Sequence, residues 1–345
     1  MSAAGQAGWV DHGDKRRACF KISDGQPATR YLVKSFLLPH LICPACLPKE
    51  YRLEPAIESE AAGDIISGEL ICVQCRRRYP LRDGVAHLLP VADGGSAGGQ
   101  LRYEEGGMVD RYLWSHYADL CGVDGNGAAN AAWADCLAGG DGASLDAGCA
   151  VGRLTFAMAA RSSWAVGCDL SGNFIKAVRT LARDRQLTFS LPLEGNLREI
   201  FRITLPTALR SDNAEFIVAD ALRLPFRRET FQQSASLNLL DRVRYPLAHL
   251  FEMNRVASCS GAAFLFASPF SWAASSAPEE LWLGGKAAGE FSGSGIDNVR
   301  SLLAGQGGIL TPPWQVSRAG TIPWQIRSHC RHHELITSEF LLAVR

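Results

Sequence analysis

The feature that most constrains the fold is a glycine-rich segment, residues 145–154, which follows a short apolar run and precedes a helical pattern. It reads Leu-Asp-Ala-Gly-Cys-Ala-Val-Gly-Arg-Leu. Small residues at such a turn let the backbone approach a ligand, and the free N–H groups at the start of a helix can face a carboxylate or a phosphate. The segment therefore predicts a strand that ends near Asp146, followed by a ligand-binding turn and a helix from Arg153.

Short apolar runs and helical patterns alternate along the chain beyond residue 101. This alternation predicts an α/β fold built on a doubly wound, mostly parallel sheet. Two stretches, 186–213 and 271–330, are longer than ordinary connections, and long insertions at the carboxyl edge of such a sheet usually build a substrate pocket. The predicted strands are 144–146, 164–169, 215–220, 234–239, 262–268 and 335–345, and the predicted helices are 153–160, 172–185 and 246–256.

Four cysteines form two Cys-x-x-Cys pairs in the first part of the chain. Cys43 and Cys46 make one pair, Cys72 and Cys75 the other, and 25 residues separate the pairs. Two such pairs complete the tetrahedral sulfur shell that zinc prefers. Redox dithiols and inert buried cysteines are the alternatives, but no βαβ pattern surrounds either pair, as a thioredoxin-like motif would require. Because all four ligands come from the protein, we predict a structural zinc ion.

Composition limits the class of protein. The 35 basic and 35 acidic residues of the 345 cancel, so no global field favours nucleic acid or an anionic membrane. No run reaches the ~18 apolar residues of a membrane span, and an odd total of 11 cysteines suits a reducing compartment. We expect a cytoplasmic protein with a lead-in (1–37), a β-rich zinc ribbon (38–92), a Gly-rich linker (93–101) and an α/β domain (102–345).

The ribbon region resembles a known module. The similarity lies in Leu37 to Cys46, Gly68 to Cys75 and Tyr79 to Pro90, which together look like the small zinc-ribbon-like activator subunit of RNA and protein methyltransferases. In that family the module steadies or activates a methyltransferase. The resemblance therefore implies a methyltransferase further along this chain, and it adds a protein partner of the ribbon to the expected interactions.

Acidic residues end three successive predicted strands, at Asp146, Asp169 and Asp220. An acid at Asp169 can accept hydrogen bonds from ribose hydroxyls, which both NAD and S-adenosylmethionine need. A dinucleotide fingerprint usually lacks the leading acid, whereas Asp146 can meet the amino group of a methionine moiety. The third strand end resembles the adenine-holding segment of class I S-adenosylmethionine methyltransferases, which implies their seven-stranded sheet and this cofactor. The expected cofactor residues are Asp146, Gly148, Ala150, Gly152, Asp169, Asp220 and Ala221, although any one of the glycines alone could mark a plain tight turn.

A narrower resemblance runs from residue 108 to the end of the chain. Its segments are similar to the methyltransferase domain of ovothiol biosynthesis, which methylates a ring nitrogen of 4-mercaptohistidine. The N-terminal part departs from that family, because it carries the zinc ribbon and no sulfoxide-synthase module. The resemblance implies a small histidine-like or other amino-acid-derived substrate. The segments are 108–117, 146–153, 171–175, 194–195, 238–242, 268–272 and 282–285.

Four residues are candidates for catalysis and substrate contacts. Methyl transfer is an in-line displacement, so the enzyme mainly aligns the nucleophile, and a ring nitrogen also needs an acceptor for its proton. Asn238 and Asp241 are candidates for polar contacts to the substrate, with a helix N-terminal acid as the alternative for Asp241. Arg242 could grip a carboxylate or be an exposed surface arginine. His116 could belong to a lid over the site or simply face the core.

Further candidates for the substrate pocket are Tyr112, Ser268, Trp272 and Trp282. The two tryptophans could stack on a planar ring or anchor a loop. A histidine-rich segment, 329–333, lies beside the last strand without matching acids, and we expect a solvated turn there.

Two other functions compete with a small-molecule methyltransferase. The first is methylation of RNA or protein with the ribbon as the docking module, although the exposed charges of Arg76 to Arg78 alone argue weakly for RNA. The second, from another class, is a non-catalytic scaffold in which the ribbon binds a partner.

Overall fold

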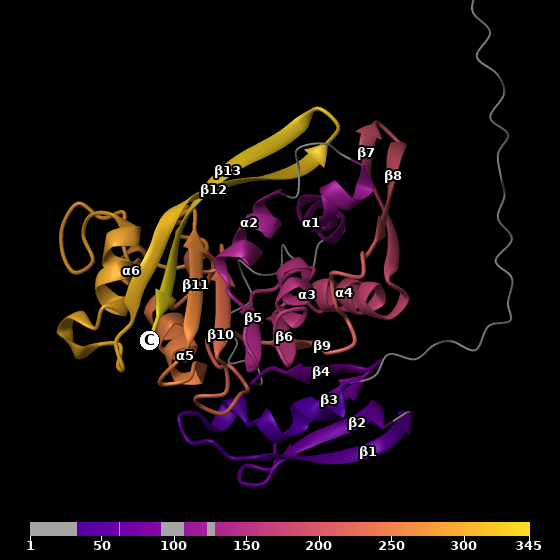
Figure 1. Ribbon diagram of the computed structural model, residues 1–345, viewed down its shortest axis with the longest axis horizontal. Helices are drawn as coiled ribbons and strands as arrows, with labels where there is room; N and C mark the ends of the chain where they lie inside the picture. Colours follow the sequence, from indigo (N-terminus) through magenta and orange to yellow (C-terminus); the bar gives the residue numbers. More distant parts are fainter. Residues whose placement is uncertain (1–32, 62, 91–106, 123–127) are drawn as a thin grey trace, which may run out of the picture.

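The computed structural model describes residues 33–61, 63–90, 107–122 and 128–345 (Figure 1). The expected linker, 93–101, and most of the expected lead-in lie outside these residues. Among the described helices, none combines the length and apolar character that a membrane span requires.

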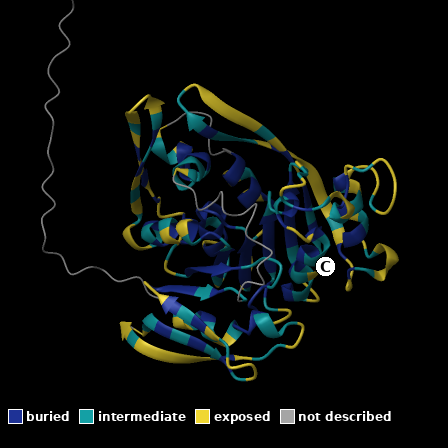
Figure 2. Cartoon of the chain, turned by 180° about the vertical axis from the view of Figure 1, so that it is seen from behind, coloured by how far each residue is buried: buried dark blue, intermediate teal, exposed yellow. Residues whose placement is uncertain are grey.

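A seven-stranded sheet forms the centre of the larger domain and confirms the predicted doubly wound α/β fold. Its order is β9-β6-β5-β10-β11-β13-β12, with the first five strands parallel and the last two antiparallel. The central strands are buried along their length (Figure 2). The chain winds outward from β5 in both directions, so the switch point of the sheet lies at this strand. The strands are β5 (Ala143–Ala147), β6 (Trp164–Asp169), β9 (Ala214–Ala219), β10 (Gln233–Leu237), β11 (Ala263–Ser268), β12 (Gln315–His329) and β13 (His332–Val344).

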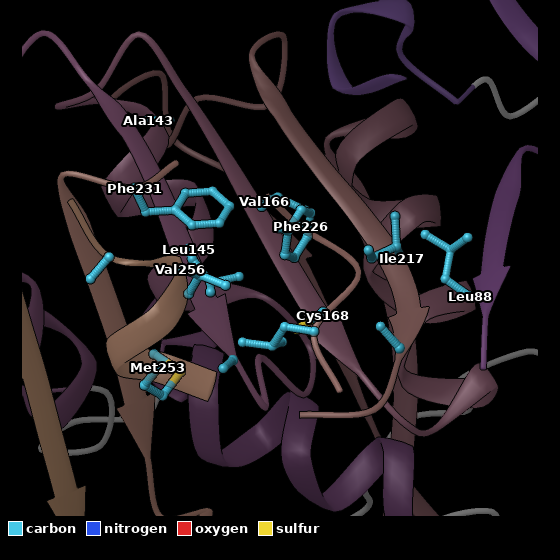
Figure 3. Packing of buried hydrophobic residues seen from close by; sticks show 14 of the residues in the cluster. Leu88, Ala143, Leu145, Val166, Cys168, Ile217, Phe226, Phe231, Met253 and Val256 are labelled. Carbon is cyan, nitrogen blue, oxygen red and sulfur yellow. The ribbon is translucent and has the colours of Figure 1, made fainter. Parts of the chain in front are cut away.

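Successive residues of the strands pack into two cores, one on each face of the sheet. Ala165 belongs to the core beneath the first four helices, whereas its neighbour Val166 belongs to the opposite core, with Met253 and Val256 of α5 (Figure 3). This alternation is the period-two signature of a strand buried on both sides. The helices are α1 (Met108–Tyr117), α2 (Ala128–Cys136), α3 (Arg153–Ala159), α4 (Gly172–Asp184), α5 (Pro246–Val256) and α6 (Gly295–Leu303).

The ribbon continues the central sheet. Its last strand pairs in parallel with β9, with His87 opposite Val218 and Leu88 opposite Ala219. Across the described residues the sheet therefore has eleven strands, and the ribbon forms one of its ends (Figure 1). The ribbon elements are η1 (Ser35–His40), η2 (Pro44–Cys46), β1 (Leu53–Ala61), β2 (Asp64–Cys72), β3 (Arg78–Arg82) and β4 (Val85–Leu88).

Apolar residues also join the ribbon to the core of the α/β domain. Leu37 and Leu41 are buried in the same cluster as Phe226 and Phe231. The N–H of Ile42 donates to the carbonyl of Pro225 over 2.9 Å. The two units predicted from the sequence thus share one core and one sheet.

Two hairpins account for much of the predicted insertions. β7 (Gln186–Glu194) and β8 (Leu197–Thr204) pair only with each other. β12 and β13 form a longer hairpin whose distal half extends over α1 and α2 (Figure 1). The expectation of an irregular stretch up to residue 330 is therefore wrong from Gln315 onward. Pro323 and the glycine at position 320 obscure the strand pattern, but β12 is an edge strand, where proline is tolerated.

Candidate active site

A cavity of about 770 Å³ opens at the carboxyl ends of the parallel strands. Its wall includes Asp146, Asp169, Asp220 and Asn238, which come from the ends of β5, β6, β9 and β10. Ligands of open α/β sheets bind at this edge, next to the switch point. The volume lies within the ~300–1,000 Å³ of small-molecule sites.

Asp169 connects the turns that follow β5 and β6. Its Oδ2 accepts a hydrogen bond from the N–H of Ala150, and its Oδ1 accepts one from the N–H of Ser171, both over 2.9 Å. A carboxylate has about four acceptor positions, so a side chain fixed in this way can also receive ribose hydroxyls. This geometry fits the role expected for Asp169 toward S-adenosylmethionine.

Asp146 is buried beside Asp169. Its Oδ2 accepts a hydrogen bond from Thr155 Oγ1 over 2.7 Å. Burial and, to a smaller extent, the negative charge of Asp169 together raise the pKa of Asp146 to about 7. A bound cation would restore the ionised form. The site therefore fits the ammonium group of a methionine moiety.

Hydrogen bonds fix the loop after β9. Asp220 Oδ1 accepts a hydrogen bond from the N–H of Leu222 over 2.9 Å, and burial raises the pKa of this carboxyl group. The ring of His249, on α5, lies 3.1 Å from the carbonyl oxygen of Ala221 through Nδ1 and 2.7 Å from Ser236 Oγ through Nε2. His249 was not predicted from the sequence, because nothing in the pattern of α5 separates it from an ordinary buried residue.

The two glycines of the turn have different surroundings. Gly148 lines the cavity with a φ of 76°. Gly152 is not among the cavity-lining residues, and a Cβ there would lie 2.4 Å from Val178 Cγ2 and 2.6 Å from Phe216 Cε1. Gly152, expected to bind the cofactor, is therefore required for the close packing of α3 against α4 and β9.

Three of the four catalytic candidates lie on the cavity wall: His116, Asn238 and Arg242. Asp241 does not, because its side chain is fully buried. Its Oδ1 accepts a hydrogen bond from Ser268 Oγ over 3.2 Å, and its Oδ2 forms a 3.4 Å ion pair with Arg242. The structure therefore places Asp241 and Ser268 behind Arg242, outside the space that a substrate can reach.

His116 presents a neutral imidazole at the wall. Burial lowers its pKa to about 4, with a smaller contribution from the Arg153 guanidinium. Its Nδ1 is buried without a hydrogen-bond partner among the described residues. The ring lies 5.9 Å from that of Tyr112, which also lines the cavity and packs 4.9 Å from Phe174.

The tryptophans expected in the pocket lie elsewhere. Trp272 and Trp282 are absent from the cavity wall and stack on each other, with ring centroids 6.0 Å apart and planes at 13°. Trp282 Nε1 donates to the carbonyl of Ala277 over 2.8 Å. Both therefore anchor the loop before α6, the alternative role considered from the sequence.

Several wall residues were not predicted from the sequence. The β12–β13 hairpin forms one side of the cavity and α2 forms another. The segment after β4 extends from the ribbon to the same wall. Only long-range folding brings these segments together, so local patterns carry no signal for them. They are Trp324, Ile326, Glu334, Ile336, Asn130, Trp133, Leu89 and Pro90.

The four paired cysteines converge as predicted. All four sulfur atoms lie within 4.8 Å of one another, with Cys43 and Cys75 separated by 3.7 Å and Cys46 and Cys72 by 3.8 Å. A tetrahedral site with Zn–S bonds of ~2.3 Å has sulfur–sulfur edges of ~3.8 Å, so the cluster fits zinc. The hydroxyl of Tyr79 lies 3.1 Å from Cys43 Sγ and can orient that ligand.

Comparisons with known families support the predictions for both the ribbon and the α/β domain. Residues 145–265 match the family described as a methyltransferase domain, and residues 34–84 match the family described as Trm112p-like protein. These matches confirm the predicted S-adenosylmethionine-dependent methyltransferase and the activator-like ribbon, although neither match is specific to ovothiol biosynthesis. No curated protein matches the chain.

Several solved structures are remotely similar to this chain. The cyclase SpnF is 19% identical over 40% of this chain and 43% of its own, with a TM-score of 0.31. A Methanosarcina mazei S-adenosylmethionine-dependent methyltransferase is 16% identical over 59% of this chain and 92% of its own, with a TM-score of 0.37. A complex of the Haloferax volcanii Trm112 methyltransferase activator with a methyltransferase is 20% identical over 52% and 62%, with a TM-score of 0.31. This chain thus spans less than half of the length of SpnF.

Proposed function

We propose that this S-adenosylmethionine-dependent methyltransferase methylates a ring nitrogen or thiol of a small histidine-like or amino-acid-derived substrate. The observation that carries the proposal is the composition of the cavity wall beyond the strand ends. There, α1, the segment after β10 and the β12–β13 hairpin bring Arg111, Arg242 and Glu334 to one cavity. Aromatic side chains of α1, α2 and the hairpin line the same space. Charges of both signs around a space of this size suit a small zwitterion.

The cofactor half of the cavity is assigned to the strand ends. Asp146 would hold the methionine ammonium group, Asp169 the ribose hydroxyls, and the Asp220 loop the adenine ring. When bound, S-adenosylmethionine supplies an electrophilic methyl group. The protein's contribution is to align the nucleophile with that group and to exclude water.

His116 is the candidate proton acceptor. A neutral imidazole at pH 7 has a lone pair available, and His116 lines the cavity. Proton transfer by a positioned histidine typically contributes ~10²–10⁴ to a rate. Tyr112 forms the adjoining aromatic wall.

The Trm112p-like match favours a second candidate, methylation of RNA or protein with the ribbon as the docking module. The charges beside the second cysteine pair offer little for RNA, since Arg78 is paired with Glu69.

One experiment separates these candidates. Zinc-loaded protein and methyl-labelled S-adenosylmethionine are incubated in four separate reactions. These contain a metabolite extract, L-histidine, total RNA and a protein extract. We expect label in a small imidazole or thiol compound identified by mass spectrometry, and none with Asp169→Ala. Label confined to RNA or protein would support the second candidate, and no label in any fraction would contradict both candidate substrate classes.

A further inference from the structure

We infer that Asn238 and Arg242 form a carboxylate-binding subsite in which Asn238 acts only as a donor, held in that orientation by Ser338 and Trp324 of the hairpin. The inference rests on the proposed function, since it names the substrate group that this part of the cavity recognises.

A chain of two hydrogen bonds leads from the hairpin to Asn238. Trp324 Nε1 donates to Ser338 Oγ over 2.9 Å, and Ser338 Oγ donates to Asn238 Oδ1 over 2.6 Å. An indole N–H can only donate, so it uses the lone pair of the serine oxygen. Ser338 is fully buried, and its hydroxyl hydrogen therefore needs an acceptor. Asn238 Oδ1 is that acceptor, which defines how the amide is turned.

The backbone holds Asn238 at the cavity. The residue follows β10 with a φ of 57°, a left-handed conformation that asparagine tolerates better than most residues. Its N–H donates to the carbonyl of Ala267 over 2.7 Å. With Oδ1 engaged by Ser338, the N–H bonds of Nδ2 have no hydrogen-bond partner among the described residues. They are the polar group that Asn238 offers to a ligand in the cavity it lines.

Arg242 provides the second set of donors from the same loop. Its guanidinium is paired at 3.4 Å with the fully buried Asp241, which in turn accepts a hydrogen bond from Ser268. A guanidinium has five N–H bonds in a rigid plane, so one ion pair leaves donors for a ligand. Asp241 and Ser268 are thus positioning residues for Arg242, just as Ser338 and Trp324 are for Asn238.

The chemistry of the subsite suits a carboxylate and not the atom that is methylated. Amide and guanidinium N–H groups match a planar anion with two oxygens, and the fixed positive charge adds to that match. The methyl acceptor needs a lone pair directed at the methyl group, and strong donors on that atom would lower its nucleophilicity. The substrate carboxylate therefore binds at Asn238 and Arg242, and the ring or thiol of the substrate is left without these donors.

The test compares ligands with and without a carboxylate on enzyme saturated with S-adenosylhomocysteine. The probes are L-histidine, 3-phenylpropionate, and histamine, which lacks the carboxylate. Asn238→Asp replaces the donor by an anionic oxygen but still accepts from Ser338. We expect the variant to bind both carboxylates about tenfold or more weakly in calorimetry, because like charges would meet, and to lose no affinity for histamine, which is a cation. Ser338→Ala and Trp324→Phe both allow the Asn238 amide to turn. Each should lower the affinity for the two carboxylates about threefold and leave the affinity for histamine unchanged.

Ser317→Ala is the matched control, because that exposed hairpin hydroxyl donates to the carbonyl of Leu342 away from Asn238. Equal losses for histidine and histamine, or no binding of either carboxylate to the wild type, would overturn the inference. The wild type could bind 3-phenylpropionate, and Asn238→Asp could abolish that binding, while no imidazole or thiol compound is methylated. In that case the proposed function fails and the subsite stands. If methylation occurs but the variants do not discriminate, the subsite fails alone.

Discussion

Glu50 of the ribbon and Arg255 of α5 form an ion pair with Oε1 and Nη1 2.9 Å apart, and their side chains are only 14% and 15% exposed. The Arg255 guanidinium also donates to the carbonyls of Phe226 and Leu224 and to Glu252. One side chain therefore links the ribbon, the loop after β9 and the end of α5. The ribbon and the methyltransferase sheet are connected through buried polar contacts as well as apolar packing.

The first prediction concerns this ion pair. Glu50→Ala leaves the Arg255 charge short of one buried partner, and removing one member of a buried pair costs about 3 kcal/mol. We expect urea unfolding of the zinc-loaded protein to show a loss of that order. Glu54→Ala is the control, because the Arg52–Glu54 pair is exposed and such pairs contribute ~0–1 kcal/mol. Equal losses in the two variants would contradict the role given to Glu50.

The second prediction links zinc to cofactor affinity. Because β4 pairs with β9, and Leu89 and Pro90 line the cavity, loss of the zinc-held ribbon should disturb the cavity wall. We expect a Cys43→Ser, Cys72→Ser variant to melt at a lower temperature and to bind S-adenosylmethionine about tenfold more weakly, ~1.4 kcal/mol. Cys259→Ser, at an exposed cysteine outside the cluster, is the control. Unchanged melting and affinity in the double variant would exclude a structural zinc ion.

Most of the proposed cofactor residues could be located from the sequence, because they follow their strands directly. Asp146, Asp169 and Asp220 each end a recognisable apolar run, and parallel strands bring such ends to one edge. The cysteine pairs are also local, since each Cys-x-x-Cys turn directs two sulfur atoms to one point. The parallel, doubly wound character of the sheet follows from the alternation of strands and helices.

The substrate side could not be predicted in the same way. Asp241 was expected at the substrate, but only the packed structure shows it fully buried behind Arg242. Trp272 and Trp282 are of a residue type that is common in ligand pockets, but their rings stack on each other. Trp324 and Glu334 reach the cavity because a long edge hairpin folds back over the domain, and nothing in their immediate neighbours in sequence indicates that contact.

The third prediction is a pH dependence at Asp146. Its pKa is raised to about 7 in the folded protein from the ordinary 3.8. The folded state then binds more protons than the unfolded state between these values. The stability of the ligand-free protein therefore falls as the pH rises from about 4 to about 7. Ionisation favours a bound ammonium group, so the affinity for S-adenosylmethionine should rise over the same interval, by up to about tenfold per pH unit.

Calorimetry between pH 5.5 and 8.5 measures this affinity. Asp146→Asn keeps the shape of the side chain and should remove most of the pH dependence together with much of the affinity. The same variant should be more stable than the wild type at pH 8 without ligand, because it buries no charge. A variant that keeps the wild-type slope would show that another group carries the pH dependence.

The fourth prediction concerns His116 as the proton acceptor. Its pKa of about 4 means that the ring is neutral throughout the neutral range, so the wild-type kcat attributable to this group should be level from pH 5 to 7 and fall only below about 4. His116→Asn should lower kcat by about 10²-fold while changing the affinity for S-adenosylmethionine less than about twofold. His332→Asn, at the exposed tip of the hairpin, is the matched control and should leave kcat unchanged. If His116→Asn instead raised the Kd for the cofactor and left kcat intact, His116 would belong to the cofactor wall and the proton would have to leave by another group.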